Sequence, residues 1–353
     1  MSMMNTARRA ATEPAIRVQD LVKRYRKAER NAVDGISFDV GAGEFFALLG
    51  PNGAGKTTTI SILTTTLLPT SGTATIAGHD LVKDASHVRQ QVGIIFQRPS
   101  LDQNLTGEEN VRLHAIMYGL ARYAPAYALM DPSYRRRIAE LSELLGIGKE
   151  VFDPVRTYSG GMRRKLEIVR SLMHDPKVLF LDEPTAGLDP PSRRTLWSYL
   201  GDVRRERSTT IFLTTHYLEE AEEADQVCCI DRGKIVASGT PEELKKALVE
   251  EYVEVDAATA DRPGLVRELE GLSLPHTGDG PFRIPLDASR THAVLKSIST
   301  PLVLVRTHAP TLEDAYLEIV DRGAREAGEA AEGGEPAGAG ALADPGSGAN
   351  PNA

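Results

Sequence analysis

A glycine-rich segment that ends in lysine and threonine has the composition and spacing of a phosphate-binding loop. Residues 50–57 read Gly-Pro-Asn-Gly-Ala-Gly-Lys-Thr, which fits the pattern G-x-x-x-x-G-K-[ST]. Glycines let the backbone curl so that its N–H groups point at phosphate oxygens, and a following helix adds its positive end. We expect Lys56 to reach the β- and γ-phosphates and the Thr57 hydroxyl to ligate Mg²⁺. The predicted nucleotide contacts of this phosphate loop are Gly50, Pro51, Asn52, Gly53, Ala54, Gly55, Lys56, Thr57 and Thr58.

The sequence on either side of the loop supports this interpretation. The strand-like run EFFALLG (44–50) precedes the loop, and the helix-like run KTTTISIL begins at its lysine. An incidental glycine-rich turn is the alternative, and this strand-to-helix context disfavours it. The loop alone predicts an NTPase or a nucleotide kinase.

A second candidate site lies at the end of an apolar run, VLFLDEPT at 178–185. Asp182 is expected at the carboxyl end of a buried strand, where it helps to hold Mg²⁺. Glu183 follows and is a candidate general base that polarises the attacking water. A solvated acidic turn is the alternative, and it leaves unexplained why such a strand follows a phosphate loop.

The elements that must position these residues alternate between two patterns. Strand-like runs at 16–25, 36–40, 44–50, 73–78, 90–97, 177–184, 209–216 and 226–231 flank a helix-rich stretch of about 103–175. Strands interleaved with helices predict an α/β sheet with a helical insert. Past residue 240, strand-like and helix-like runs predict a small second α/β unit over 241–325. Residues 1–14 and 326–353 are expected to be flexible, since they hold few large apolar residues.

Composition restricts the partners and the compartment. The 353 residues carry a formal net charge of −8, which gives no basic footprint for nucleic acid. Apolar runs are far shorter than the roughly 18 residues that span a bilayer, and the N-terminus has no secretory pattern. We therefore expect a cytoplasmic protein that reaches membranes through a partner. The two adjacent cysteines, Cys228 and Cys229, are expected to be apolar fillers on opposite faces of a strand.

The segment Tyr158-Ser-Gly-Gly-Met162 resembles the signature motif of ABC ATPases, usually LSGGQ, with Tyr158 for Leu and Met162 for Gln. The resemblance extends to further motifs in the family's order. They are Tyr25 as the adenine-stacking aromatic, Gln97 as the glutamine loop, Gly187-Leu188-Asp189-Pro190 as the D-loop, and His216 as the switch histidine. This resemblance covers residues 15–240. It implies a P-loop NTPase cassette with a RecA-like core, an antiparallel β subdomain and a helical subdomain.

The same resemblance implies a mechanism. Two cassettes, as a homodimer or with a paralogue, meet head to tail and trap ATP between the phosphate loop of one and the signature motif of the other. Ser159, Gly160, Gly161 and Asp189 then contact the partner's nucleotide. His216 contacts the γ-phosphate, and Gln97 senses Mg²⁺ and water beside an integral membrane permease. The expected location is the cytoplasmic face of the membrane.

Within the family, YSGGMRRKLEI, DEPTAGLDPPSRRTLW and FLTTHYLEEAE are similar to the daunorubicin/doxorubicin-resistance exporters. That similarity implies export of a drug-like or lipophilic compound, and it makes the C-terminal unit an accessory domain for dimerisation and regulation. Export of lipids, polysaccharides or lantibiotics is the nearest alternative. Residues 123–134 depart from the family, because this segment is longer than usual and its prolines predict a loop or broken helix.

Three other functions remain as alternatives. An ABC ATPase acting on ribosomes or DNA is disfavoured by the single cassette and the acidic net charge of −8. A nucleotide kinase is disfavoured by the signature-like segment and His216. A catalytically inactive cassette is disfavoured because Lys56 and both carboxylates of the acidic strand end are present.

Overall fold

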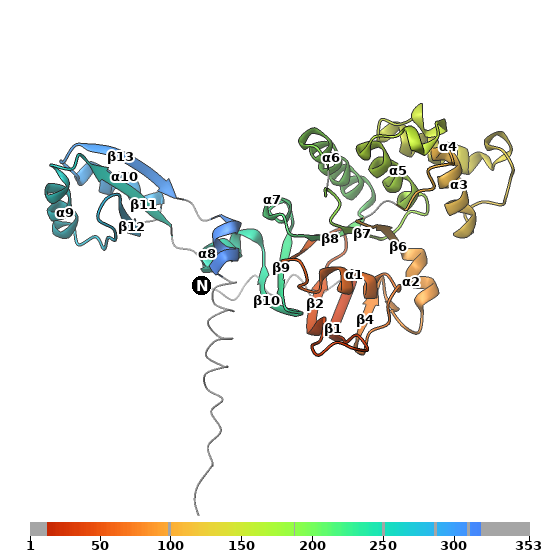
Figure 1. Cartoon of the computed structure of the whole chain (residues 1–353), viewed down its shortest axis with the longest axis horizontal. Coiled ribbons are helices and arrows are strands. Elements are labelled where there is room, and N and C mark those ends of the chain that lie inside the picture. The colour runs from red at the N-terminus through yellow and green to blue at the C-terminus, as the bar shows by residue number, and fades with distance from the viewer. Residues whose placement is uncertain are drawn as a thin grey trace, which may run out of the picture.

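The computed structural model describes residues 13–97, 100–186, 188–248, 251–285, 288–308 and 311–318. Its centre is a six-stranded sheet of order β10-β9-β3-β8-β7-β6 (Figure 1). The bounds are β10 (Lys234–Gly239), β9 (Gln226–Asp231), β3 (Phe45–Leu49), β8 (Thr210–Thr215), β7 (Val178–Asp182) and β6 (Val92–Ile95). All neighbours pair in parallel except β10, which is antiparallel to β9. The carboxyl ends of β3, β7 and β8 therefore meet at one edge.

A second sheet is antiparallel, with order β2-β1-β4-β5. Its strands are β2 (Val33–Val40), β1 (Ile16–Lys23), β4 (Ser71–Ile76) and β5 (His79–Asp80), and α2 (Ala85–Gln91) follows. Phe38 on β2 stacks on Phe46 of β3 with ring centroids 5.1 Å apart, and this contact joins the two sheets. The helix α1 (Lys56–Leu63) contributes Ile60 and Leu63 to the same core.

Side chains alternate across the central sheet, so each strand serves two cores. On β3, Phe46 and Leu48 face the antiparallel sheet, whereas Phe45 faces the core under the helices. The adjacent cysteines on β9 follow the same rule: Cys228 lies in the first core and Cys229 in the second. Burial raises the pKa of each thiol to about 12. This confirms their prediction as apolar fillers on opposite strand faces.

The stretch predicted to be helical contains α3 (Gly107–Met117), α4 (Pro132–Leu144) and α5 (Gly160–Leu172). Short 3-10 turns at Tyr127–Leu129, Glu150–Phe152 and Val155–Thr157 connect them. The side chain of Thr106 accepts a hydrogen bond from the Glu109 N–H, and Glu109 bonds back to the Thr106 N–H, so a capping box starts α3. Two further helices, α6 (Pro190–Arg207) and α7 (Leu218–Ala221), pack beside the sheet.

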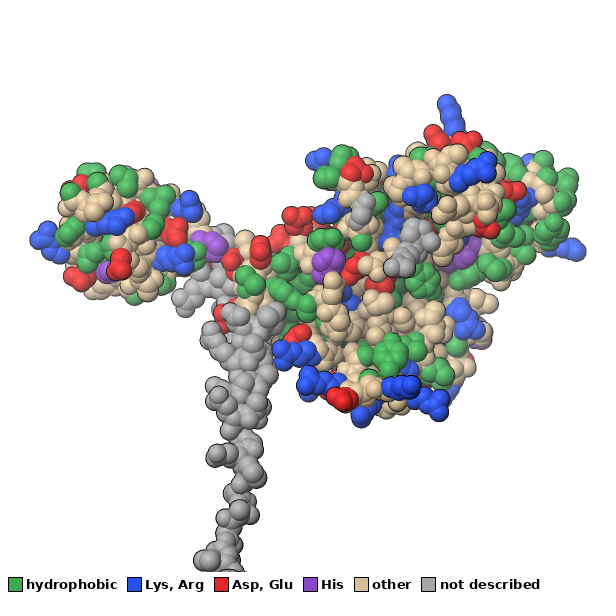
Figure 2. Space-filling view, viewed as in Figure 1, with side chains coloured by type: hydrophobic (Ala, Val, Ile, Leu, Met, Phe, Trp, Pro, Cys, Tyr) green, Lys and Arg blue, Asp and Glu red, His purple; other side chains and the backbone are tan. Residues whose placement is uncertain are grey.

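Residues 123–131 form a loop with one short 3-10 turn, which is the first of the two predicted alternatives, a loop or a broken helix. After the short turn at Tyr127–Leu129, α4 starts at Pro132 with Asp131 as its cap. Met130 is buried, whereas Tyr123 and Leu129 are exposed. Figure 2 shows hydrophobic side chains gathered at this end of the helical region.

The C-terminal part contains a separate three-stranded sheet, β12-β11-β13. The elements are α8 (Pro241–Leu248), β11 (Tyr252–Ala257), α9 (Arg262–Gly271), β12 (Phe282–Pro285), α10 (Ala288–Ser297) and β13 (Leu302–His308). Val255, Leu265 and Ile284 belong to its own core. Figure 1 shows this sheet and its helices set apart from the cassette.

The first and last described helical segments of this C-terminal part pack on the cassette and not on the three-stranded sheet. Leu244 on α8 and Leu312, in the helical residues 312–318, belong to the core of the cassette. The three-stranded unit is therefore joined to the cassette by elements that pack on the cassette. The division at residues 240 and 241 stays a prediction. Residues 1–12, from the predicted flexible N-terminus, and the predicted tail 326–353 lie outside the described residues.

Among the described residues, no helix combines the length and the apolar composition that crossing a bilayer requires. The longest helix in the described ranges, α6, has 18 residues and carries several arginines.

Candidate active site

The phosphate loop connects the end of β3 to the start of α1, as the sequence predicts. A Cβ on Gly50 would lie 2.2 Å from the Ile230 carbonyl oxygen, and one on Gly55 would lie 2.4 Å from that of Ala32. Gly55 also has a φ of 111°, which side chains other than glycine rarely adopt. No side chain caps α1, so the N–H groups of its first turn are suited to an anion.

Lys56 is held over this loop by the loop itself. Its Nζ donates to the carbonyl oxygens of Gly50 at 2.7 Å and Pro51 at 3.0 Å. The ammonium also lies 3.7 Å from Oε1 of Glu183, and the side chain is 4% exposed. Burial lowers the pKa of Lys56, and the charges of Glu183 and Asp182 oppose that shift. The lysine is thus placed over the phosphate loop, beside two carboxylates.

The carboxylates end β7 as predicted. Thr214 on the neighbouring strand β8 donates its hydroxyl to Oδ1 of Asp182 at 2.5 Å. Burial raises the pKa of Asp182, while the Thr214 hydrogen bond and the Lys56 charge lower it. Glu183 has a φ of 45°, a left-handed conformation that costs about 1–3 kcal/mol and is concentrated at functional sites.

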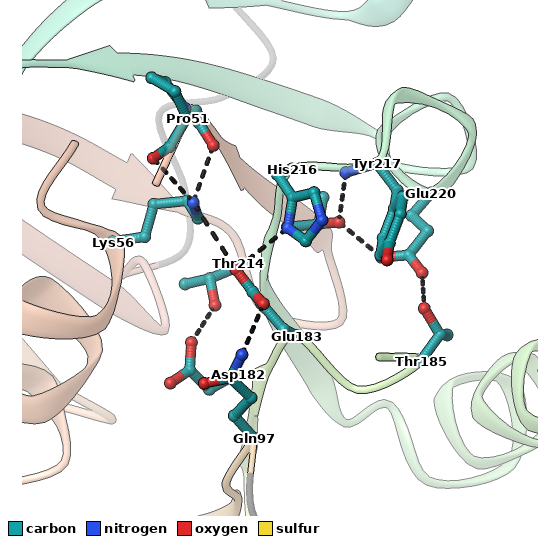
Figure 3. Close-up of polar contacts among 12 residues, drawn as sticks. Pro51, Lys56, Gln97, Asp182, Glu183, Thr185, Thr214, His216, Tyr217 and Glu220 are labelled. Carbon is teal, nitrogen blue, oxygen red and sulfur yellow. Dashed lines mark hydrogen bonds and ion pairs between the residues drawn. The ribbon is translucent and has the colours of Figure 1, made fainter. Parts of the chain in front are cut away.

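Three side chains from separate elements converge on the Glu183 carboxylate (Figure 3). Gln97, just after β6, donates Nε2 to Oε2 at 2.9 Å. His216, just after β8, has Nδ1 3.1 Å from Oε1. With Lys56 this gives the carboxylate three polar partners, although it stays at the sheet edge where a substrate would bind. A carboxylate so held can accept a proton from a water molecule.

The residues predicted to hold Mg²⁺ offer oxygen donors. They are the exposed hydroxyl of Thr57, the Asp182 carboxylate and the Gln97 amide. Hard oxygen donors of this kind are what Mg²⁺ prefers, and it is typically held by one or two carboxylates together with substrate phosphates. Within the described ranges, no group of three or more His, Cys, Asp or Glu side chains forms a protein-only metal site. The donor set therefore fits Mg²⁺ bound jointly with a nucleotide.

Tyr25 lies beside the same loop. Its hydroxyl is 3.3 Å from that of Thr58, and the residue is 45% exposed. Lys23 places its Nζ 5.8 Å from the ring centroid. The ring thus offers a surface on which a base can stack.

The signature-like residues form a second group. Ser159 caps α5, its Oγ accepting from the Met162 N–H at 3.2 Å, and Asp189 caps α6, accepting from the Ser192 N–H at 3.3 Å. A Cβ on Gly161 would lie 3.1 Å from the Ser192 hydroxyl, so the starts of the two helices adjoin. No hydrogen bond or ion pair found in the described part of the chain joins this group to Lys56 or Glu183. Gly187, from the predicted D-loop, lies outside the described residues.

Several supporting residues escaped the sequence analysis. Buried Glu220 accepts from the hydroxyls of Thr215 at 2.6 Å and of Thr185. It thereby joins the end of β8, just before His216, to the segment after Glu183 (Figure 3). Burial raises the pKa of Glu220. One signal was present in the sequence, because Glu220 lies four residues after His216 in a run of glutamates, but nothing there marks it as the buried one.

Comparisons with known proteins agree with this geometry. The sequence matches the ABC transporter family over residues 33–186. It is 37% identical over 342 residues to the daunorubicin/doxorubicin resistance ATP-binding protein DrrA of Streptomyces peucetius, covering 91% of this chain and 98% of that protein. The chain belongs to the ABC transporter ATP-binding family. It is 38% identical to the Nod factor export ATP-binding protein I of Ralstonia nicotianae, covering 89% of this chain and 96% of that protein.

A solved structure of an ATP-binding subunit of an ABC transporter superposes with a TM-score of 0.57 at 31% identity, over 66% of this chain and 92% of that one. The fold is therefore the ABC cassette predicted from the motifs, and the chain is an ATP-binding ATPase of that family. The predicted resemblance to the daunorubicin/doxorubicin-resistance group is also confirmed, since the similarity extends over nearly the whole length of DrrA. Among the solved structures of similar fold, cbiO1 of Clostridium perfringens is described as part of the ABC transporter complex cbiONQ, and the ATP-binding cassette MJ0796 is described as dimeric.

Proposed function

We propose that this ABC ATPase powers export of a drug-like or lipophilic compound through a separate transmembrane permease. The 37% identity to a daunorubicin/doxorubicin resistance protein over 98% of its length supports this class of cargo. The relative named for Nod factor export is equally similar, at 38% identity. One relative is named for drug resistance and the other for export, so the cargo needs its own test.

ATP binds through the phosphate loop in this proposal. The N–H groups at the start of α1 and the Lys56 ammonium receive the phosphates, and the adenine stacks on Tyr25. The uncapped α1 and the exposed Tyr25 ring support these assignments. Thr57, Asp182 and Gln97 hold Mg²⁺, which neutralises phosphate charge when bound.

Glu183 acts as the general base for hydrolysis. Its carboxylate accepts a proton from the attacking water, while Gln97 and His216 hold it in place. His216 also contacts the γ-phosphate. The single observation that carries this assignment is the convergence of Lys56, Gln97 and His216 on Glu183, at 3.7, 2.9 and 3.1 Å.

The second group of residues acts across a dimer. Ser159, Gly160, Gly161 and Asp189 face the ATP held by another cassette, either a second copy or a paralogue. Among the described residues, no hydrogen bond or ion pair joins them to Lys56 or Glu183 within one chain, which supports a role in trans. ATP favours the closed dimer and hydrolysis loosens it, because the two states bind ATP and its products with different affinity.

The permease partner places the chain at the cytoplasmic face of the membrane, and no nucleic-acid partner is expected at a net charge of −8. The exposed side chains of Met117, Tyr123 and Leu129 support docking at the end of the helical region. Met117 is the most exposed of these, at 77%, and exposed apolar patches commonly mark contact sites.

The test is co-purification of the tagged full chain from native membranes in mild detergent. A stoichiometric polytopic membrane protein is the expected result, and recovery with ribosomes or DNA instead contradicts transport. The triple variant Met117→Ser, Tyr123→Ser, Leu129→Ser should release that protein. Leu68→Ser, at a similarly exposed site between α1 and β4, should not.

Cargo is tested by expressing the chain with that membrane protein in a sensitive host. Lower anthracycline accumulation with wild type, and not with Glu183→Gln, supports a drug-like cargo. Equal anthracycline accumulation in cells with wild type and in cells with Glu183→Gln contradicts a drug-like cargo. It leaves the ATPase assignment intact.

A further inference from the structure

Helix α5 carries three charged residues on one buried face, one turn beyond its start at the signature-like segment. Arg164, Glu167 and Arg170 follow one another at intervals of three. Glu167 is 0% exposed and Arg164 5% exposed. Buried charges require partners, and these have partners in two segments that carry candidate catalytic residues.

Arg164 bridges both of those segments. Its Nη1 donates to the carbonyl oxygen of Phe96 at 2.5 Å, and its Nε donates to that of Pro184 at 2.9 Å. Phe96 directly precedes Gln97, and Pro184 directly follows Glu183. One guanidinium therefore holds the backbone next to both residues.

Glu167 binds the backbone three residues beyond Gln97. Its Oε2 receives Nη1 of Arg164 at 3.0 Å, and its Oε1 receives the N–H of Ser100 at 3.0 Å. Arg170 adds bonds of 2.7 Å each to the Ser100 carbonyl oxygen and hydroxyl. Gln97 thus lies between two backbone points, Phe96 and Ser100, that are both fixed to α5.

Stability alone is a weak reason for such a cluster. Replacing a buried ion pair by apolar residues of similar volume is often neutral or stabilising, because the desolvation of the charges offsets their attraction. The desolvation is evident here, since burial lowers the pKa of both Arg164 and Arg170. Unlike apolar packing, charged side chains form directional hydrogen bonds. Here each of the three charged side chains bonds to a specific backbone atom.

We propose that Arg164 and Glu167 are positioning residues that fix Gln97 against Glu183 and tie both to the helix that begins at Ser159. They act through the backbone of Phe96, Ser100 and Pro184, so a movement of α5 when its start meets a partner's nucleotide is passed on to the segments that carry Gln97 and Glu183. This inference rests on the roles proposed above for Gln97 and Glu183.

The test measures ATP hydrolysis by the purified full chain. Glu167→Gln keeps the volume and an acceptor for Ser100, but it removes the charge that Arg164 needs. We expect kcat to fall about tenfold with the KM for ATP within twofold, because small misplacements of a reacting group cost rate rather than binding. In a Gln97→Ala background the same substitution should lower kcat by clearly less than tenfold, since only the contact beside Glu183 is left to disturb.

Glu108→Gln is the matched control. Glu108 is also buried on a helix, lies 3.5 Å from Arg112 and accepts from the Tyr134 hydroxyl at 3.0 Å, but it touches neither segment. The Glu108→Gln protein should be less thermally stable than wild type but have the same kcat. If Glu167→Gln behaves in the same way, or if its loss multiplies with that of Gln97→Ala, the positioning role is wrong.

Arg164→Lys covers the case in which Glu167→Gln does not fold. It keeps the charge, but a single ammonium cannot reach both Phe96 and Pro184, so the same fall in kcat is expected. Unchanged kcat in folded Arg164→Lys overturns the proposal. If Gln97→Ala keeps the wild-type kcat, both the role proposed for Gln97 and this inference are wrong. If Gln97→Ala loses kcat but Glu167→Gln does not, only this inference is wrong.

Discussion

Nδ1 of His216 lies 3.1 Å from Oε1 of Glu183. The two residues are 33 positions apart, and each directly follows one of the adjacent parallel strands β8 and β7. The ladder that pairs Asp182 with Thr214 sets the separation of the two strand ends. Sheet geometry, rather than loop conformation, therefore brings the histidine to the carboxylate.

Substituting the carboxylate tests its role as general base. In Glu183→Gln we expect ATP binding to persist and turnover to fall by about 10²-fold or more, the usual contribution of a general base. The amide fills the same volume, so the hydrogen bond from Gln97 can remain. Phosphate release and light scattering with ATP check this, and the variant should accumulate as an ATP-bound dimer. Turnover at the wild-type rate would mean that another group takes the proton.

Removing the lysine tests the phosphate loop. Lys56→Ala should weaken ATP binding roughly 10- to 100-fold, since a hydrogen bond to a charged group contributes about 1.5–3 kcal/mol. Calorimetric titration with ATP gives the affinity. Lys234→Ala, at an exposed lysine paired with Asp34, is the control and should bind ATP as wild type does. Equal affinity in Lys56→Ala and wild type contradicts the assignment.

The sequence predicted the residues at strand ends well, because apolar runs that stop at Gly50 or Asp182 indicate both the strand and the edge. It could not predict Thr214 or Glu220, whose importance comes from neighbours that are distant in the chain. Thr214 matters because β8 pairs with β7 beside Asp182. A threonine at the end of an apolar run carries no sign of that pairing.

The C-terminal region illustrates a second limit. The helical pattern around Leu312 indicates that one face is buried, but not which core receives it. In the structure Leu312 packs into the cassette core rather than the core of the three-stranded unit. The short strands β5 and β10 were also missed, since two residues, or a run such as KIVASG after a turn, give little periodicity.

Two substitutions of Tyr25 distinguish stacking of its ring on adenine from hydrogen bonding by its hydroxyl. If the ring stacks on adenine, Tyr25→Ala should weaken ATP binding by about 1–3 kcal/mol, and Tyr25→Phe should bind as wild type does although it loses the contact with Thr58. Affinities for ATP and for GTP measured side by side check this, because stacking tolerates either base. Equal weakening in both variants would assign the effect to the hydroxyl.

Gly160 tests the role of the signature-like segment in trans. A Cβ on Gly160 meets nothing within 4 Å, so Gly160→Ala should fold and bind ATP normally in the monomer. It should nevertheless hinder the approach of another chain's phosphate, and lower ATP-dependent dimerisation and turnover. Sedimentation in the Glu183→Gln background measures the dimer. A Gly160→Ala protein that dimerises and hydrolyses ATP like wild type contradicts the role in trans.

The buried side chain of His114 on α3 should make the free energy of unfolding fall in acid, and this effect does not depend on nucleotide binding. Burial, with the nearby charges of Arg170 and His174, lowers its pKa from 6.5 to about 3. Between those values the unfolded chain binds the proton and the folded chain does not, so stability falls as pH falls through 6.5. At pH 5 this amounts to about 2 kcal/mol, at 1.36 kcal/mol per pKa unit. Denaturant unfolding at pH 7.5 and 5 should show this loss in wild type and a smaller one in His114→Phe, which keeps an aromatic ring against Tyr118. Equal losses in the two proteins would mean that the His114 proton is not linked to folding.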